Sequence, residues 1–202
     1  MVAATPDDVR LPPLPPGEWP PEMGDVLAAL RPPNPRHPFP PRRDDRPKGL
    51  NVLGLLARYP ALTRAYNTFN GHVLYGTSLS PRQRELLVLR VAAIRDATYE
   101  WAQHVVIARD VGLSDAEIAG VAEGPEAAGA DGADGWSSLE RAMLRAVDEL
   151  VRDAMITDAT WAELAASLDA EQLMDLVFTV GCYDLLAMAL RSFGLPLDDD
   201  LK

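Results

Sequence analysis

The sequence predicts an all-α fold that follows a proline-rich arm. Of the 18 prolines in 202 residues, 14 lie within the first 47 positions, so the composition changes near Lys48. From Gly49 onward, apolar residues recur at three- and four-residue spacing, and no alternating, strand-like run is present. We therefore expect an extended segment over residues 1–47 and an all-helical domain over residues 48–202.

Repeated prolines make residues 1–47 a poor helical unit, because proline removes backbone donors and favours polyproline II. The segment nevertheless holds large apolar side chains that would anchor an arm on the helical body or on a second subunit: Trp19, Met23, Leu27 and Phe39. A disordered tail is the alternative interpretation, and the sequence leaves both open.

Local signals mark the ends of the expected helices. Ser80, followed by Pro81 and Gln83, is a typical helix start, and Ser114 with Glu117 forms a second capping box. Gly112 suits a left-handed helix end. The expected helices are two stretches separated at Pro60, then residues 81–95, 99–111, a short helix after Ser114, and residues 139–154, 158–167 and 170–192.

Composition excludes several classes of protein. The net charge of -11 and the pI of about 4.7 disfavour binding to nucleic acid. A single cysteine, Cys182, permits neither an internal disulfide nor a cysteine-based zinc site, which favours a cytoplasmic location. No uninterrupted apolar stretch reaches the roughly 20 residues of a membrane helix, so no membrane partner is expected. Phosphate-binding loops, EF-hands and nucleophile elbows are missing from the sequence.

Glu85, Glu100 and His104 form the most informative constellation. Glu100 and His104 are four residues apart, on one face of a helix, and Glu85 lies on the preceding helix, which we expect to pack antiparallel. An imidazole beside a carboxyl group whose pKa is raised by burial can exchange protons near neutral pH. The pattern predicts proton transfer on a carbon acid without a cofactor, although a structural hydrogen bond or a solvent-facing pair would give the same spacing.

Other polar residues are weaker candidates. Tyr99 or Gln103 would hydrogen-bond a developing enolate, and His72 is a secondary candidate that solvent exposure or helix capping explains equally well. Glu85, Glu100 and His104 have ligand chemistry for a divalent ion, but the three histidines of the chain are dispersed and no metal is expected. Cys182 lies in the most apolar helix, where we expect it to act as a small core residue.

Several segments together resemble the carboxymuconolactone decarboxylase and alkylhydroperoxidase D-like superfamily of small all-helical proteins. They are Leu-Ser-Pro-Arg-Gln-Arg-Glu85, Tyr-Glu-Trp-Ala-Gln-His104, Gly112-Leu-Ser, Val-Gly-Cys-Tyr-Asp184 and Phe193-Gly-Leu-Pro, and the resemblance covers roughly Leu50 to Pro196. Peroxidase members carry Cys-x-x-Cys followed by three residues and a histidine, with a glutamate on the preceding helix. Here Ala97 and Glu100 occupy the cysteine positions, so thiol peroxidase activity is not expected.

What remains at these positions matches the decarboxylase branch, whose members transfer protons and release carbon dioxide without a metal or organic cofactor. The resemblance therefore implies a cofactor-free lyase, decarboxylase or isomerase. Its substrate would be a small unsaturated keto acid, lactone or related carbon acid, in catabolism or specialised-metabolite biosynthesis. His104 would move the proton, while Glu100 and Glu85 orient it. The resemblance also implies a homo-oligomer, a trimer or hexamer. A non-catalytic binding or assembly protein that kept the fold is the alternative.

Overall fold

The computed structural model describes residues 9–39, 46–127 and 136–202, and every regular element within these ranges is helical. The predicted all-α class is confirmed. The chain divides into two compact units, one comprising Ser78–Ala187 and the other Met1–Thr77 with Met188–Lys202. Each unit is described separately below.

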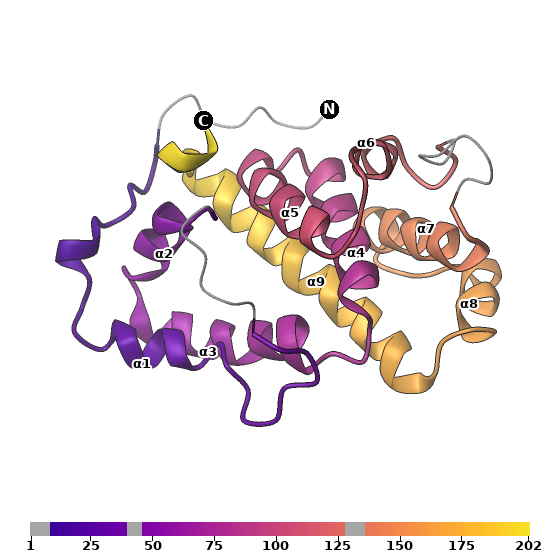
Figure 1. The fold of residues 1–202 in the computed structure, drawn as a ribbon, viewed down its shortest axis with the longest axis horizontal. Helices are drawn as coiled ribbons and strands as arrows, with labels where there is room; N and C mark the ends of the chain where they lie inside the picture. The colour runs from indigo at the N-terminus through magenta and orange to yellow at the C-terminus, as the bar shows by residue number, and fades with distance from the viewer. Residues whose placement is uncertain (1–8, 40–45, 128–135) are drawn as a thin grey trace. The chain divides into compact units, whose positions relative to one another are not determined.

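The first unit contains short helices and the described part of the arm (Figure 1). Its elements are η1 (Pro16–Glu18), α1 (Met23–Ala28), α2 (Leu50–Leu56), α3 (Pro60–Gly71), the π-helical turn η2 (His72–Gly76) and η3 (Asp199–Leu201). Helix α1 packs against α3. The segment predicted to be extended therefore includes one short helix, because the sequence between Pro21 and Pro32 has no proline to interrupt it.

The arm is packed against this unit by apolar contacts and backbone hydrogen bonds. Met23, Val26 and Ala57 form a small buried cluster, and Leu14, Trp19 and Leu27 pack against it. The backbone N–H of Leu14 donates to the carbonyl of Gly54 at 3.1 Å. Only glycine fits at position 54, because an added Cβ would lie 2.2 Å from the Leu14 oxygen. Three of the expected anchors, Trp19, Met23 and Leu27, thus hold the described arm in place.

The second unit is built around α4 (Pro81–Ile94). Helices α5 (Thr98–Asp110), α6 (Asp115–Glu123) and α7 (Ser138–Asp153) all pack against α4, and α8 (Asp158–Ala165) packs against α7. The long helix α9 (Ala170–Phe193) begins in this unit. The buried core is apolar: Leu86, Leu89, Ala108, Leu113, Ile118, Val121, Trp136 and Leu144. Trp101 and Val105 pack against it.

Three helices of this unit begin with complete capping boxes. In each, a serine side chain accepts a hydrogen bond from the backbone N–H three residues later, and the side chain of that later residue accepts one from the backbone N–H of the serine. The pairs are Ser80 with Gln83, Ser114 with Glu117, and Ser137 with Glu140. The first two boxes were predicted from the sequence. The third was not, although Ser137 and Glu140 have the same spacing.

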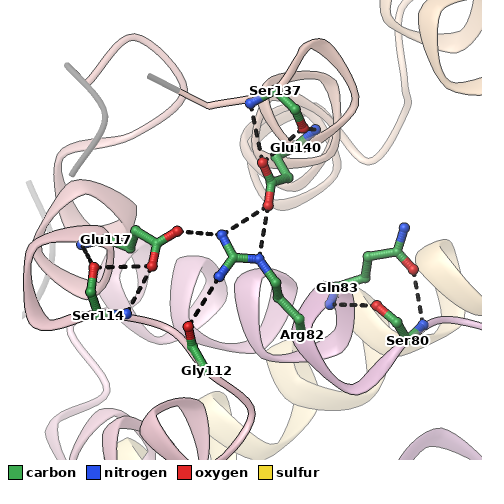
Figure 2. Close-up of polar contacts among 8 residues, drawn as sticks. All are labelled: Ser80, Arg82, Gln83, Gly112, Ser114, Glu117, Ser137 and Glu140. Carbon is green, nitrogen blue, oxygen red and sulfur yellow. Dashed lines mark hydrogen bonds and ion pairs between the residues drawn. The ribbon is translucent and has the colours of Figure 1, made fainter. Parts of the chain in front are cut away.

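Arg82 joins two of these capping boxes (Figure 2). Its guanidinium donates to Glu117 at the start of α6 and to Glu140 at the start of α7, the latter at 3.0 Å. It also reaches the carbonyl of Gly112 at 3.5 Å. The hydrogen bond from Arg82 is the largest influence on Glu117, and it lowers the pKa of that carboxyl below its usual value. We call Arg82, Glu117 and Glu140 the Arg82 cluster.

Helix α9 is long and apolar enough to span a membrane by length and composition, with a mean hydropathy of 1.7 over an 18-residue window. Asp175 and Asp184 interrupt its apolar sequence, so it is not the uninterrupted apolar stretch that the sequence analysis excluded. Within the structure 44% of that window is buried. Core helices of soluble proteins pass the same test, so this is weak evidence for a membrane segment.

Candidate active site

The connection between α4 and α5 brings Glu85 and His104 together. Helix α4 ends at Ile94 and α5 begins at Thr98, and Asp96 between them adopts a left-handed conformation with φ of 52°. Aspartate is one of the few non-glycine residues that enter this region at modest cost. The tight connection lets α5 return alongside α4.

Glu85 and His104 form a buried pair. The Nδ1 atom of His104 lies 2.7 Å from Oε2 of Glu85, and Arg84 Nε donates to Oε1 of the same carboxylate at 2.9 Å. Burial alone would raise the pKa of Glu85, but His104 and Arg84 together lower it below the usual value. Glu85 is therefore an ionised carboxylate that accepts the Nδ1 proton of His104 and fixes the orientation of its ring.

A third helix contacts the histidine. The ring of Tyr183 on α9 meets the imidazole of His104 edge-on, with ring centroids 4.9 Å apart and planes at 88°. Such T-shaped contacts are favoured between aromatic rings. With Glu85 bonded to Nδ1 and Tyr183 against the ring, His104 is restricted to one orientation, as a group that transfers a proton in a defined direction must be.

Glu100 has the least usual environment of the three. Its side chain is 1% exposed, and neither carboxyl oxygen has a hydrogen-bond partner among the residues that the structure describes. Burial, and to a lesser extent the charge of Asp184, raises the pKa of Glu100 well above its usual value. Glu100 is therefore easier to protonate than an exposed glutamate. It lies one helical turn before His104 on α5.

The other predicted candidates divide into two groups. Gln103 Nε2 donates to the hydroxyl of buried Tyr99 at 3.2 Å, so these two form a pair beside Glu100 and His104 on α5. His72 belongs to the first unit, in the turn η2, where its side chain is exposed. The structure thus brings Tyr99 and Gln103 onto the helix of the site and does not place His72 among its buried groups.

Sequence reasoning missed residues that support the site. Arg84 holds the second oxygen of Glu85, and Tyr183 holds the ring of His104. Asp184 accepts from Arg95 on both oxygens, one of them at 3.0 Å, which keeps a charged group near Glu100. These residues lie within the segments that carried the family resemblance, yet nothing in their spacing indicated which side chain each would contact.

Two further observations concern ligands. Within residues 9–39, 46–127 and 136–202, no group of three or more histidine, cysteine, aspartate or glutamate side chains is placed to hold a metal ion. Cys182 is buried, forms no disulfide and precedes Tyr183 in the sequence.

Both the sequence and the fold of the chain are similar to those of known proteins. Residues 60–149 match the model of the carboxymuconolactone decarboxylase family. An uncharacterized peroxidase-related protein with the alkylhydroperoxidase core from Ralstonia eutropha is 17% identical, with a TM-score of 0.71, over 97% of this chain and 96% of that one. A peroxidase-related protein from Silicibacter is 16% identical, with a TM-score of 0.66, over 75% and 78%.

A debrominase has the same fold at 12% identity, with a TM-score of 0.71, over 96% of this chain and 95% of that one. A cysteine-to-alanine variant of that debrominase has been crystallised with 2,3,4-tribromopyrrole. Identities this low establish the fold alone. Comparison with curated proteins gave no significant match.

Proposed function

We propose that the chain, whose residues 60–149 match the carboxymuconolactone decarboxylase family and whose fold is alkylhydroperoxidase D-like, is a cofactor-free acid–base enzyme. In this proposal it acts as a lyase, decarboxylase or isomerase on a small unsaturated keto acid, lactone or related carbon acid. The reducing cytoplasm is its expected location. One observation carries the proposal: a buried Glu100 whose pKa is raised lies one helical turn from a buried His104, and the Nδ1 atom of His104 is bonded to Glu85, whose pKa is lowered.

The two carboxyl groups suit different roles because their environments move their pKa values in opposite directions. Ionised Glu85 orients His104 through Nδ1, which leaves Nε2 to take a proton from the substrate carbon. Protonated Glu100 donates a hydrogen bond to the oxygen on which negative charge develops. A pair of titratable groups with divergent pKa values is the usual sign of an acid and a base assigned to separate tasks.

The same groups serve both reaction types. In an isomerisation, His104 takes the proton from one carbon of the substrate and returns it to another. In a decarboxylation, the bond to the carboxylate carbon breaks, carbon dioxide leaves, and the electron pair forms an enolate. Before that bond breaks, Nε2 of His104 takes the proton of the substrate's carboxylic acid. Glu100 stabilises the enolate by hydrogen bonding, and His104 then gives the same proton to the enolate carbon and returns to its neutral form. Tyr99 and Gln103 are proposed to contact the polar end of the substrate.

The debrominase with the same fold was crystallised, as a cysteine-to-alanine variant, with 2,3,4-tribromopyrrole, so small planar rings belong among the compounds to test. It does not support the same chemistry, because Ala97 and Glu100 stand at the positions where peroxidase relatives carry cysteines. The alternative, a binding or assembly protein, is favoured by one observation. The Glu85 carboxylate is fully used by Arg84 and His104, as in a structural ion pair.

Hydrogen–deuterium exchange at the acidic carbon of a substrate distinguishes an enzyme from a binding or assembly protein. A panel of small unsaturated keto acids and lactones is incubated in D₂O with the protein or with its His104→Ala variant, and deuterium incorporation is followed by NMR. Exchange that needs His104 supports the enzyme, whatever the net reaction. Binding without exchange, seen as line broadening of one compound in both samples, would favour the binding protein. Exchange that is equal for both proteins would remove His104 from its role.

A further inference from the structure

Resting on the function proposed above, we propose that Thr179 of α9 is a further substrate-binding residue, whose hydroxyl holds an oxygen on the side of the acidic carbon opposite to Glu100. The substrate class is then carbon acids whose acidic carbon lies between two oxygen functions, as in a β-keto acid or an acyl lactone. Three features carry the inference: the unused hydroxyl of Thr179, its place one turn from Tyr183, and the directions of α5 and α9. All these residues belong to the second unit.

The hydroxyl of Thr179 is buried and unused. The residue is 1% exposed, and its Oγ1 atom has no hydrogen-bond partner among the residues that the structure describes. A threonine in a helix can donate to the carbonyl four residues earlier, as Thr68 does to Arg64 at 2.9 Å. The equivalent bond from Thr179 to the carbonyl of Asp175 is not made. A buried hydroxyl without a partner costs free energy and therefore calls for an explanation.

Thr160 of α8, in the same unit, shows that burial does not by itself leave a threonine hydroxyl unused. Thr160 is 2% exposed, and its hydroxyl donates to Oε1 of Glu149 at 2.8 Å. Thr179 instead shares with Glu100 the combination of burial and side-chain oxygens that no described residue bonds. Thr179 and Glu100 are therefore the two oxygen-bearing groups to consider for a ligand.

Thr179 lies on the face of α9 that meets the histidine of the site. It precedes Tyr183 by four residues, so both side chains lie on one face of the helix, about 6 Å apart along its axis. Tyr183 contacts the ring of His104 edge-on, with centroids 4.9 Å apart. Thr179 is therefore one helical turn from the residue that touches the proposed base.

Polar contacts at the two ends of α4 give the direction of α9. Ser78, just before α4, donates through its backbone N–H to Asp175 at 2.6 Å. Arg95, just after α4, donates to Asp184 at 3.0 Å. The stretch of α9 from Asp175 to Asp184 therefore runs in the same direction as α4. Helix α5 follows α4 after a short turn and packs back along it, so α5 and α9 are antiparallel.

Glu100 and Thr179 consequently flank His104 from opposite sides. Glu100 is one turn before His104 on α5, and Thr179 is one turn before Tyr183 on α9. Because the two helices are antiparallel and His104 contacts Tyr183, these turns extend in opposite directions from that contact. A substrate whose acidic carbon lies at Nε2 of His104 can then direct one oxygen function toward Glu100 and another toward Thr179.

Two oxygen functions also suit the chemistry of the base. Imidazole is a mild base toward carbon. A C–H bond between two carbonyl groups is more acidic than one beside a single carbonyl, because the negative charge spreads over both oxygens. Glu100 donates a hydrogen bond to one of these oxygens and Thr179 to the other. A compound without the second oxygen leaves the Thr179 hydroxyl unpaired, so the site discriminates against it.

The test compares the binding of two ligands that differ in one oxygen. In α-acetyl-γ-butyrolactone the acidic carbon lies between a ketone and the lactone carbonyl, and in α-isopropenyl-γ-butyrolactone a CH₂ group replaces the ketone oxygen. Ligand-observed NMR titration gives the Kd of each compound for the wild type and for Thr179→Val, which keeps the shape of threonine without its hydroxyl. The variant should bind the acetyl compound about ten-fold more weakly, the usual effect of one lost hydrogen bond, and the isopropenyl compound equally well.

Urea unfolding adds a measurement that separates a binding role from a structural one. Thr179→Val removes a buried hydroxyl that has no partner in the described chain, so the variant should be at least as stable as the wild type. Thr160→Val is the matched control, because its hydroxyl is bonded to Glu149, and it should lower stability and leave both Kd values unchanged. Destabilised Thr179→Val that binds both compounds like the wild type would make Thr179 a structural residue.

Binding and proton exchange are measured separately, so this inference and the proposed function fail in different ways. Exchange that needs His104, together with unchanged binding by Thr179→Val, keeps the enzyme and removes Thr179 from the site. Weaker binding of the acetyl compound alone by Thr179→Val, without exchange that needs His104, keeps the binding role of Thr179 and overturns the chemistry. A wild type that binds neither compound, or binds both equally well, overturns the inference.

Discussion

Two polar clusters start on the same turn of α4 and differ in how completely their charges are paired. In the Arg82 cluster, both carboxylates accept from Arg82 and also cap a helix. Three residues later, Glu85 pairs with Arg84 and His104, but Glu100 beside them is buried with neither oxygen bonded to any described residue. The paired charges of the Arg82 cluster stabilise the fold, whereas a buried carboxyl group without a partner, such as that of Glu100, does not.

The difference indicates which cluster is available for chemistry. A buried polar group without a partner costs free energy, so native proteins keep few of them, and each calls for an explanation. In the Arg82 cluster each charged side chain has a charged partner, and both carboxylates also take part in capping boxes (Figure 2), so a structural role explains them. An acid kept protonated by burial has a clear use only when a substrate arrives to accept its hydrogen bond.

The largest expected effect is on activity. His104→Ala removes the proposed base and should lower the rate of substrate exchange about 100- to 10,000-fold, the usual contribution of general acid–base catalysis. Far-ultraviolet circular dichroism should show the helical content unchanged. His72→Ala is the matched control, because His72 is exposed and belongs to the first unit. A comparable loss in the control would mean that the site has been placed wrongly.

Glu85→Gln should give the largest loss of stability. Glutamine keeps the shape of Glu85 but removes the charge that Arg84 and His104 share, and breaking a buried ion pair costs about 3–5 kcal/mol. Urea unfolding at neutral pH measures this change. A loss below about 1 kcal/mol would show that the pair is solvated and that His104 is not held by it.

Arg82→Met should destabilise the fold less and leave catalysis intact. The cluster is partly exposed, so we expect a loss of about 1–3 kcal/mol in the free energy of unfolding. A double-mutant cycle with Glu117→Gln isolates the pairwise part of that loss. The exchange rate per folded molecule should stay within about two-fold of the wild type. A larger fall in rate would contradict the division between a structural and a chemical cluster.

Sequence reasoning reached the fold because its signals are local. Ser80 with Gln83 and Ser114 with Glu117 start helices through contacts three residues apart, and the apolar spacing of residues 81–110 defines two helices joined by a short turn. The pairing of Glu85 with His104 follows once those helices are antiparallel. The resemblance to the superfamily, carried by short segments of sequence, is confirmed by the family match and the shared fold.

What sequence reasoning could not reach depends on contacts between distant segments. Nothing in the chain indicates that Tyr183 meets His104, or that Arg82 joins α6 to α7, because both are fixed by helix packing. The difference between Glu85 and Glu100 was also out of reach. Two glutamates of the same type acquire opposite pKa shifts from their partners and burial alone. The short helix α1 was missed because the surrounding prolines dominated the interpretation of residues 1–47.

The smallest expected effect is the pH dependence of stability. It distinguishes the two clusters clearly, because it has opposite signs for Glu100 and Glu117. The pKa of Glu100 is raised by folding, so its contribution to stability is complete below its unfolded value of about 4.3 and is lost as pH rises. At neutral pH, ionisation of this group in the unfolded chain stabilises the unfolded state relative to the folded one. Glu100→Gln cannot ionise, and it should therefore unfold at a higher urea concentration than the wild type at pH 7, with the gap closing toward pH 4.

Glu117→Gln is the matched control with the reverse sign. The pKa of Glu117 is lowered by folding, so its contribution is complete above about 4.3 and is lost as pH falls. This variant should be less stable than the wild type at pH 7 and approach it in acid. Glu100→Gln should also lose substrate exchange while gaining stability, a combination that a purely structural residue does not give. If Glu100→Gln instead lowers stability at pH 7, the carboxyl is ionised and paired in solution, and its assignment as the acid is wrong.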